Sequence, residues 1–303
     1  MQSSDYAVLG AGLMGVGIAT HFIRHGHEVL LYDPDPQRLA EASGILAELS
    51  DVGQFDRGER DAALARLRVT GDLNGVARAR LLIEAIPERL ELKHALYEQL
   101  ERLIADDAVI ASNTSGLPPD ELAARMTHPQ RLLIAHFWHP PHLIPLVEIV
   151  PGRATDPRHL AAVQALLGGM ALEAVLLERA APGFVGNRLQ FAVLREALHI
   201  VHSGIASAEV VDQVMRASLG RRYAMVGPLE AADMTGLATV ADIARHLFPE
   251  LATGDEMMAL VEQRLRRGDT GQRSGRGFYL WDEARRERIQ RRRAHQLRFA
   301  LKP

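Results

Sequence analysis

Near its start the chain has a glycine-rich stretch whose spacing suits the binding of a pyrophosphate. An apolar run over 6–9 precedes three glycines at G-x-G-x-x-G spacing, and an apolar helical pattern follows and closes at Gly26. The first glycine permits a tight turn, the second lets a pyrophosphate approach the backbone, and the third lets helix and strand pack closely. The helix also offers free N–H groups and its positive dipole end to the phosphates. The predicted cofactor contacts of this stretch are Gly10, Gly12, Leu13, Met14 and Gly15.

A carboxylate after the next predicted strand, over 28–32, selects the dinucleotide. Asp33 lies eighteen residues beyond Gly15. A carboxylate at this spacing accepts hydrogen bonds from the adenosine ribose hydroxyls and repels a 2′-phosphate, so the pattern favours NAD over NADP. The alternative interpretation is a glycine-rich turn followed by an ordinary acidic loop residue.

Composition and charge exclude several other classes of protein. The chain has 303 residues, no cysteine and a formal net charge of −3. There is therefore no disulfide, no thiolate zinc site and no cysteine nucleophile, and nothing indicates nucleic acid as a partner. We see neither a signal peptide nor a run of about twenty apolar residues, so the sequence predicts a cytoplasmic protein without a membrane segment.

Strands that alternate with helices predict an α/β fold with a parallel, doubly wound sheet in the first half of the chain. Ligands bind such sheets beyond the carboxyl ends of the strands. The dipeptide Pro182-Gly183 marks a domain boundary, which gives a Rossmann-type NAD-binding domain over 1–180 and a smaller all-α domain over 181–303. Predicted strands lie at 6–9, 28–32, 69, 81–85, 109–111, 131–136, 146–150 and 172–176, and predicted helices at 36–49, 60–67, 90–103 and 157–168.

Beyond the boundary the pattern is helical, with helices expected over 184–203, 207–218, 229–247 and 255–267. The helix over 184–203 is apolar around most of its circumference, which is typical of a helix buried on several sides. This pattern predicts a homodimer. The arginine-rich tail after Asp282 is expected to be a solvated helix face, and a binding patch is the alternative.

Six motifs in order resemble the short-chain 3-hydroxyacyl-CoA dehydrogenase family over nearly the whole chain. The resemblance supports the α/β fold and NAD as the cofactor, with a small hydroxy acid or an acyl-CoA as the substrate. The motifs are the glycines of 10–15, the sequences IEAIPE at 83–88 and ASNTS at 111–115, the stretch from His136-Phe137 to Glu148, PGFVGNR at 182–188 and GRGFY at 275–279.

The resemblance implies a role for each matching residue. His136 corresponds to the catalytic histidine and Glu148 to its carboxylate partner, while Ser115 and Asn187 correspond to residues that hold the substrate. The resemblance also implies that the nicotinamide side of the cofactor site is lined by Glu88, Lys93 and Asn113.

The implied chemistry is physically reasonable. Oxidation of a secondary alcohol needs a base for the hydroxyl proton, and a neutral histidine suits that task near pH 7. A carboxylate on the other ring nitrogen fixes the tautomer and stabilises the imidazolium. Without the family, His136 would be structural, Glu148 a buried charge paired elsewhere, and Asn187 a helix cap.

Two departures from the family pattern concern the substrate side. The family has Phe-Phe-Asn-Pro after the histidine, whereas this chain has Phe137-Trp138-His139-Pro140, so His139 is a candidate substrate residue. A metal site built from nearby histidines lacks matching ligands elsewhere, and we predict none. The second departure is the segment 39–67, which contains no lysine, although family members that act on acyl-CoA use lysines there for phosphate contacts.

Other stretches, HPPHLIPLVE at 139–148 and GRRYAMVGP at 220–228, are similar to a neighbouring branch. It comprises the gulonate dehydrogenase and lambda-crystallin group, carnitine dehydrogenases and a dehydrogenase of hydroxymethyl-pyridine carboxylates. In that interpretation Arg222, or Arg221, pairs with a substrate carboxylate; otherwise the two are a surface arginine pair in a loop. The expected function is thus NAD-dependent oxidation of a 3-hydroxyacyl substrate, with a small free hydroxy acid as one alternative and a non-catalytic, crystallin-like protein as another.

Overall fold

The computed structural model describes residues 5–49 and 57–300 of the chain. The contacts divide the chain into two compact units, one formed by Met1–Val185 with Arg293–Pro303 and the other by Gly186–Arg292. The predicted division into 1–180 and 181–303 stays a prediction.

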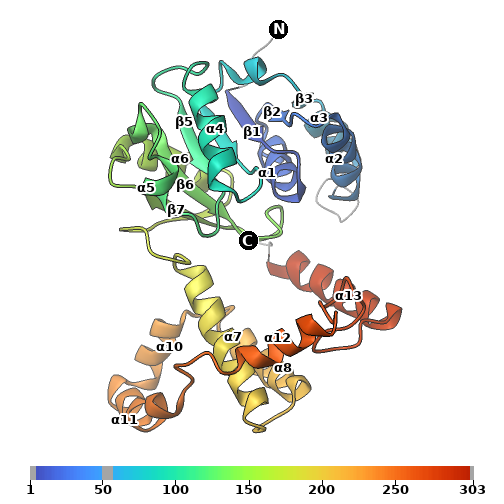
Figure 1. The fold of residues 1–303 in the computed structure, drawn as a ribbon, viewed down its shortest axis with the longest axis vertical. Coiled ribbons are helices and arrows are strands. Elements are labelled where there is room, and N and C mark those ends of the chain that lie inside the picture. The colour runs from blue at the N-terminus through green and yellow to red at the C-terminus, as the bar shows by residue number, and fades with distance from the viewer. Residues whose placement is uncertain (1–4, 50–56, 301–303) are drawn as a thin grey trace. The chain divides into compact units, whose positions relative to one another are not determined.

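The first unit contains an eight-stranded sheet in the order β3-β2-β1-β4-β5-β6-β7-β8 (Figure 1). Adjacent strands are parallel except β6 and β7, which form an antiparallel pair. The strands are β1 (Tyr6–Leu9), β2 (Val29–Tyr32), β3 (Leu67–Thr70), β4 (Leu81–Glu84), β5 (Val109–Ser112), β6 (Leu132–Phe137), β7 (Leu146–Pro151) and β8 (Glu173–Leu176).

This order has the switch point of doubly wound folds, because β1 lies between β2 and β4 and the chain leaves it first in one direction and then in the other. The predicted strands and the α/β class are confirmed. The sheet is parallel, as expected, except that β7 runs antiparallel to β6. Only a short loop joins β6 to β7, and parallel strands need a longer crossover connection.

Helices cover both faces of the sheet. They are α1 (Leu13–Arg24), α2 (Pro36–Leu49), α3 (Arg57–Leu64), α4 (Leu90–Leu100), α5 (Pro119–Leu122) and α6 (Pro157–Gly169), with two 3-10 turns at Leu73–Val76 and Pro129–Arg131. The helix predicted over 60–67 begins and ends three residues earlier, because Leu67 already pairs with Val29 in the sheet.

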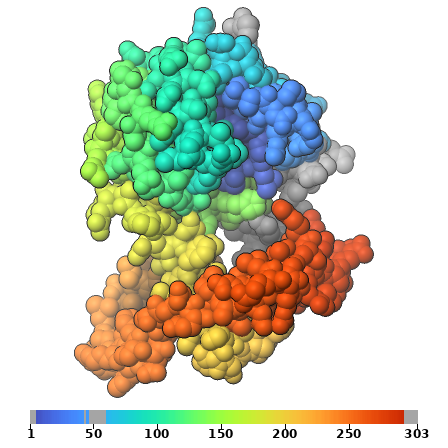
Figure 2. All heavy atoms as spheres, viewed as in Figure 1, coloured from blue at the N-terminus to red at the C-terminus, as the bar shows by residue number. Residues whose placement is uncertain are grey.

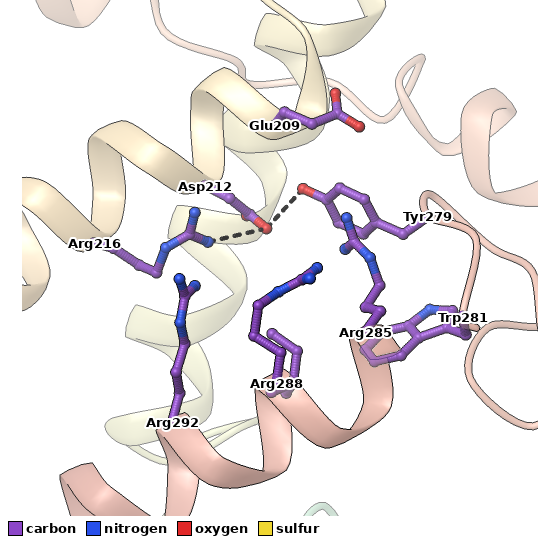
Figure 3. Close-up of a pocket in the computed structure, with 9 residues that line it drawn as sticks. Glu209, Asp212, Arg216, Tyr279, Trp281, Arg285, Arg288 and Arg292 are labelled. Atoms are coloured by element: carbon purple, nitrogen blue, oxygen red, sulfur yellow. Dashed lines mark hydrogen bonds and ion pairs between the residues drawn. The ribbon is translucent and has the colours of Figure 1, made fainter. Parts of the chain in front are cut away.

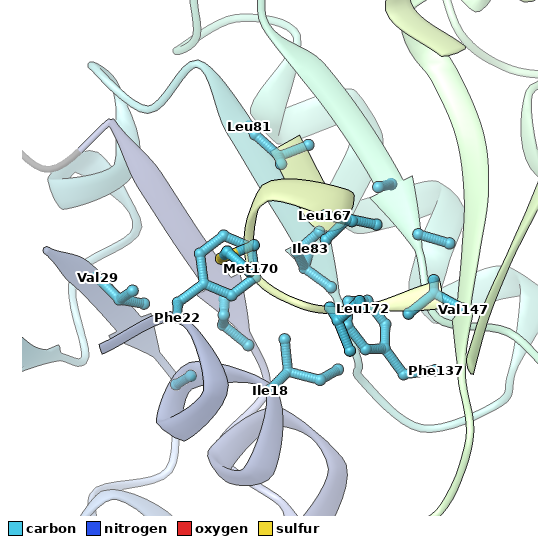
Figure 4. Packing of buried hydrophobic residues seen from close by; sticks show 14 of the residues in the cluster. Ile18, Phe22, Val29, Leu81, Ile83, Phe137, Val147, Leu167, Met170 and Leu172 are labelled. Atoms are coloured by element: carbon cyan, nitrogen blue, oxygen red, sulfur yellow. The ribbon is translucent and has the colours of Figure 1, made fainter. Parts of the chain in front are cut away.

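Two hydrophobic clusters fill the space between the sheet and the helices. Along β4, Leu81 and Ile83 belong to the cluster under α1 and α6, whereas Leu82 belongs to the cluster under α4. Figure 4 shows Phe22 of α1 beside Met170 in the first of these clusters. Because both faces are buried, the strands are nearly continuous apolar runs, and a polar residue within one is exceptional.

The second unit is helical, as predicted. Its helices are α7 (Gly186–His202), α8 (Ala208–Ala217), α9 (Leu219–Arg222), α10 (Pro228–Thr235), α11 (Leu237–Leu247) and α12 (Met258–Arg266), with a 3-10 turn at Phe248–Glu250. The last helix, α13 (Glu283–Ala300), belongs to this unit as far as Arg292. The single helix predicted over 229–247 is wrong, because Gly236 has φ +93° and separates α10 from α11. The segment around Arg222, expected as a loop, forms the short helix α9.

Little apolar surface is buried within the second unit. Leu198 and Met257 are its buried hydrophobic residues, whereas Phe191 is 58% and Met225 is 83% exposed. In Figure 2 the yellow to red residues of this unit reach the surface along much of their length. Among the described residues, no helix is long and apolar enough to cross a membrane.

One buried histidine links the stability of the first unit to pH. His21 on α1 is 8% exposed, and its Nε2 lies 2.8 Å from the Met170 carbonyl oxygen, to which it donates. Burial, reinforced by the nearby charges of His25, Arg24 and His142, lowers the pKa of His21 to about 4 against a weaker opposing effect of the Met170 hydrogen bond.

We expect the free energy of unfolding to fall between pH 6.5 and pH 4 because of His21. An unfolded histidine has a pKa near 6.5, so the unfolded state binds more protons in this window. The contribution is complete above pH 6.5 and is lost as the pH falls to 4, by up to about 3 kcal/mol. His21→Gln keeps a donor for Met170 and should flatten this dependence in urea unfolding followed by circular dichroism. His246→Gln, at an exposed histidine, should keep the wild-type slope; equal slopes for all three proteins would contradict the assignment.

Candidate active site

The glycine turn between β1 and α1 has the geometry that the sequence predicts. Gly10 has φ +104°, and a Cβ added there would lie 2.7 Å from the carbonyl oxygen of Ala85. A Cβ on Gly15 would lie 1.8 Å from the carbonyl oxygen of Gly10. A Cβ on Gly12 would meet nothing within 4 Å. Packing therefore requires Gly10 and Gly15, whereas Gly12 leaves open space beside the first turn of α1.

That open space fits the phosphates of a dinucleotide. The first N–H groups of a helix have no partner within it, and here they belong to Leu13, Met14 and Gly15 at the start of α1. Leu13 is 53% exposed and Met14 is half-buried.

Asp33 follows β2 and lies against the same turn. Its Oδ2 accepts from the Ala11 N–H at 2.8 Å, and its Oδ1 accepts from the Asp35 N–H at 3.0 Å. Each carboxylate oxygen has a further lone pair with which to accept from a ribose hydroxyl. Asp33 thus fixes the glycine turn and is suited to hold the ribose, and these residues together fit NAD.

The carboxylate of Glu84, at the end of β4, is completely buried. Four donor groups make five hydrogen bonds to its two oxygens. Lys93 Nζ lies 2.7 Å from Oε1 and 2.9 Å from Oε2. The Ile86 N–H donates at 2.9 Å, the Tyr97 hydroxyl at 2.7 Å and the Ser112 hydroxyl at 2.6 Å. A buried charge is tolerated only when it is paired and hydrogen-bonded, and Glu84 meets that condition.

Helix periodicity and strand register explain this cluster. Lys93 and Tyr97 are four residues apart on α4 and therefore share the helix face that packs on the sheet. Glu84 pairs in register with Ser112 on β5, so the two side chains lie on the same sheet face. Burial, reinforced by the charge of Glu84, raises the pKa of the Tyr97 hydroxyl well above its usual value, so this hydroxyl stays a donor.

Glu88 connects this cluster to the turn after β5. Lys93 Nζ lies 3.3 Å from Oε2 of Glu88, and Oε1 of Glu88 accepts from the Thr114 hydroxyl and, at 3.0 Å, from the Ser115 N–H. Lys93, a predicted cofactor residue, is fully buried and contacts the carboxylates of Glu84 and Glu88, and its role toward the cofactor stays a prediction. Its observed contacts position Glu88, whose side chain is 41% exposed.

Asn113 also positions a neighbouring segment of the protein. Its Oδ1 accepts from the Phe137 N–H at 2.8 Å, which joins the end of β5 to the end of β6. The predicted contact of Asn113 with the cofactor stays a prediction.

His136 and Glu148 form a buried pair across the antiparallel strands β6 and β7. They are direct partners in the register, and His136 Nδ1 lies 3.0 Å from Glu148 Oε2. Directly opposed residues in an antiparallel pair have adjacent side chains, so the reversal of β7 creates this contact. Because the carboxylate accepts from Nδ1, the Nε2 atom of a neutral His136 is the basic nitrogen.

Two further donors hold the Glu148 carboxylate. The Val185 N–H donates to Oε1 at 2.8 Å, and Trp138 Nε1 lies 3.2 Å from Oε2. Gly183 with φ +76° and Phe184 with φ +52° make the turn that brings Val185 to this carboxylate. The rings of Phe184 and Trp138 lie 5.5 and 5.7 Å from the His136 ring, centroid to centroid.

The loop between β6 and β7 lies beside α1. A Cβ added to Gly17 of α1 would lie 2.6 Å from Cγ of Pro141, so this fourth glycine permits a close approach of the loop. His139, on the same loop, is exposed, as is Ser115 on the turn after β5. Among the described residues, no group of three or more His, Asp or Glu side chains is placed to hold a metal ion.

The first unit thus brings together several of the predicted residues, whereas Asn187 and Arg222 belong to the second unit, in the first turn of α7 and at the end of α9. Sequence reasoning placed Glu84, Thr114 and Trp138 in no site. In the sequence, Glu84 stands out as a charged residue at the end of an apolar strand. Such a charge requires a partner, and the sequence does not identify that partner.

The switch-point glycine turn and Asp33 have the arrangement of a dinucleotide-binding domain, and the buried His136–Glu148 pair lies in the same unit. The NAD-binding domain of 3-hydroxyacyl-CoA dehydrogenase matches residues 5–180, and the C-terminal domain of the same enzyme matches residues 183–281. The chain belongs to the 3-hydroxyacyl-CoA dehydrogenase family, an NAD-dependent family of oxidoreductases.

Similar proteins of this family carry several activities in their names. The chain is 31% identical to 5-formyl-3-hydroxy-2-methylpyridine 4-carboxylate 5-dehydrogenase of Mesorhizobium japonicum, over 97% of this chain and 96% of that protein. It is 36% identical to 3-hydroxybutyryl-CoA dehydrogenase of Mycobacterium tuberculosis, over 90% and 97%. A crystal structure of the pyridine carboxylate enzyme, described as an NAD+ dependent dismutase, has a TM-score of 0.87 at 29% identity and covers 98% of this chain and 96% of its own.

Replacement of Gly12 by alanine should separate cofactor binding from folding. The added methyl group meets no protein atom within 4 Å, so the free energy of unfolding should change by at most about 1 kcal/mol. The same methyl group occupies the space needed by the pyrophosphate, and we expect the Kd for NADH to rise at least tenfold in a fluorescence titration.

Gly15→Ala is the matched comparison. Its Cβ collides with the Gly10 carbonyl oxygen, so this variant should lose at least about 2 kcal/mol of stability in urea unfolding. Unchanged NADH affinity in Gly12→Ala would show that the pyrophosphate does not approach the backbone there.

Proposed function

We propose that this protein oxidises a CH–OH group to a carbonyl with His136 as the base and Glu148 as the partner of that base. The observation that carries the proposal is the buried 3.0 Å contact between His136 Nδ1 and Glu148 Oε2. NAD, held by the glycine turn and Asp33, supplies the acceptor for the hydride. The substrate is a 3-hydroxyacyl compound or a related hydroxy acid.

The arrangement of His136 suits proton transfer in both directions. Its Nδ1–H is directed to Glu148, so Nε2 is left to accept the hydroxyl proton of the substrate. As the ring becomes positively charged, the adjacent buried carboxylate stabilises it. Ser115 and Asn187 are the proposed donors to the substrate oxygen.

Glu148 is suited to this role because its own position is fixed. Its two oxygens accept from backbone and side-chain donors besides His136, so the carboxylate cannot rotate away without breaking them. Fixed dipoles and charges aimed at a developing charge avoid the cost of reorganisation during the reaction. The Val185 N–H and the Trp138 indole are therefore proposed as positioning groups for the catalytic pair.

The proposal predicts a large loss of turnover in His136→Gln. Removal of the base should lower kcat by at least about 10²-fold, because general base catalysis contributes 10²–10⁴-fold. Affinity for NADH should stay within twofold, because the glycine turn and Asp33 are unchanged. His246→Gln should retain wild-type kcat. Undiminished kcat in His136→Gln would exclude His136 as the base.

The assay needs both proposed substrate classes. Acetoacetyl-CoA in the reducing direction and a panel of free hydroxy acids in the oxidising direction, each followed by NADH absorbance, provide the rates. NADH binding without turnover on any of these compounds would favour the non-catalytic alternative.

A free carboxylate substrate is a second candidate, and the segment 39–67 favours it over an acyl-CoA. That segment contains six acidic residues, three arginines and no lysine. A surface that binds the phosphates of coenzyme A should carry a positive excess. Arg222 is then the proposed partner of the substrate carboxylate, and His139 is a second substrate residue. A higher kcat/KM on free hydroxy acids than on acetoacetyl-CoA would support this candidate.

We also propose that the protein is a homodimer. The supporting observation is the apolar surface of α7, where Leu189, Phe191 and Leu194 are 55%, 58% and 43% exposed. Exposed apolar surface of this extent is typical of a protein–protein interface. A second copy of this chain is the proposed occupant, because α7 carries these residues in a unit with few buried hydrophobic residues of its own.

Light scattering should give a mass near twice 33.3 kDa at micromolar concentration. Phe191→Glu should shift the protein to monomer, because it places a charge in the proposed interface. Gln190→Glu introduces the same charge at the neighbouring exposed position and should leave the mass closer to that of the dimer. A monomeric wild-type protein would contradict the proposal.

A further inference from the structure

The second unit contains a cavity of about 200 Å³ that is separate from the residues of the dehydrogenase site. It lies between α8 and α13, and the glycine-rich turn before α13 closes one side (Figure 3). Its α13 residues lie beyond residue 281, where the match to the family's C-terminal domain ends. The other lining residues, on α8 and on the turn before α13, lie within that match.

The charge of the cavity is strongly uneven. Four arginine side chains and two carboxylates line it, which leaves a formal excess of two positive charges. Like charges held this close repel one another, and a bound anion would relieve that repulsion. The arginines are Arg216, Arg285, Arg288 and Arg292, and the carboxylates are Glu209 and Asp212.

Helix periodicity directs these side chains toward one another. Arg285, Arg288 and Arg292 are spaced by three and four residues, so they share one face of α13. In Figure 3 Arg288 and Arg292 extend from α13 toward α8, which carries Asp212 and Arg216. The cavity is thus built by two helix faces and not by a chance meeting of surface loops.

Two of the arginines are already held by protein groups. Arg216 lies 3.7 Å from Oδ2 of Asp212, and the Arg285 guanidinium lies 4.0 Å above the Tyr279 ring. The Tyr279 hydroxyl donates to Asp212 Oδ2 at 2.7 Å, and this contact ties the turn before α13 to α8. Burial, this hydrogen bond and the Asp212 charge raise the pKa of Tyr279 to about 12, so its hydroxyl remains a donor.

The other two arginines give the cavity its binding capacity. Within the residues that the structure describes, Arg288 and Arg292 have no hydrogen bond or ion pair to a protein group. The adjacent Arg291 instead pairs with Glu287 at 2.8 Å and does not line the cavity. The two unpaired guanidinium groups carry the charge that the carboxylates leave unbalanced.

We propose that this cavity binds the phosphate group of a small phosphate monoester. Guanidinium groups are suited to phosphate because their planar N–H pairs match its oxygens, and a dianion balances the excess of two charges. Arginines that approach from two helices match the three terminal oxygens of a tetrahedral phosphate better than the two oxygens of a planar carboxylate. Trp281 and Ile289 supply an apolar wall for the esterified carbon.

The size of the cavity limits the ligand. Pockets that enclose drug-sized ligands measure roughly 300–1,000 Å³, so this cavity admits a phosphate group and a few carbon atoms. Titration with inorganic phosphate and with glycerol phosphate distinguishes a site for free phosphate from a site for a phosphate monoester.

The test is calorimetric titration of the full-length protein at pH 8 and constant ionic strength. NAD is present at saturation, so that the glycine turn of the first unit is occupied and cannot bind the probe. The probes are inorganic phosphate, glycerol phosphate and, as a dicarboxylate of equal charge, succinate. We expect saturable binding of one phosphate per chain, tighter binding of glycerol phosphate, and at least tenfold weaker binding of succinate.

Variants on one helix provide the matched comparison. Arg288→Gln and Arg292→Gln should each weaken phosphate binding at least tenfold, whereas Arg291→Gln removes the same charge outside the cavity and should change the Kd less than twofold. Circular dichroism and the midpoint of thermal unfolding verify that each variant is folded. Arg288→Lys keeps the charge without the planar fork and should bind phosphate more weakly than the wild type.

Three results would overturn the proposal. The first is no saturable phosphate binding to the wild-type protein. The second is an equal loss in Arg291→Gln, which would show a general effect of helix charge. The third is succinate binding as tight as phosphate binding, which would show a site for any dianion. None of these results bears on NAD-dependent turnover, so the dehydrogenase proposal is tested separately.

Discussion

The burial of a carboxylate at the end of a central strand constrains the rest of the candidate site. Glu84 lies without solvent at the end of a strand whose residue on the same face, Leu82, is apolar, and an unpaired charge there would be strongly destabilising. Its oxygens therefore need donors from a backbone turn, from α4 and from β5. Satisfying this one group fixes α4 against the sheet and places Lys93 where it also reaches Glu88. Through Glu88 the same constraint extends to the turn that carries Thr114 and Ser115.

The same rule applies to His136 and Glu148, the pair proposed to be catalytic, but there the contact comes from the register of two strands. Glu148 is also a buried carboxylate, and its partner His136 is supplied by strand register and not by a helix. Ser112, His136 and Glu148 lie on the sheet face that Ile110, Leu132, Ile134 and Val150 cover with apolar side chains. Each of these strands thus carries a polar residue beside its apolar ones on this face. Together the polar side chains form a row across neighbouring strands. The antiparallel turn into β7 brings the last carboxylate back toward that row.

Much of the fold could be predicted because hydrophobic periodicity is a local property. The strands under the glycine turn and most helices follow from short apolar patterns. The direction of β7 could not be read in this way, because its apolar run is the same in either direction and only the connection decides it. The break at Gly236 was missed because one glycine is tolerated inside a helix unless its φ is positive. Similarly, the sequence showed that Glu84 and Lys93 were present but not that one neutralises the other, since that contact depends on the packing of α4 on β4 and β5.

Position 93 is a lysine in a chain whose basic residues are nearly all arginines, and its contacts explain this choice. The 35 basic residues of the chain are two lysines and 33 arginines, and one of the two lysines is completely buried. A compact ammonium group can direct separate N–H bonds to both oxygens of Glu84 and to Glu88, at 2.7, 2.9 and 3.3 Å. A guanidinium is larger and planar, and its rigid fork favours one carboxylate held in its own plane. The geometry of two carboxylates around one point therefore selects lysine, whereas the open faces of α8 and α13 accept arginine.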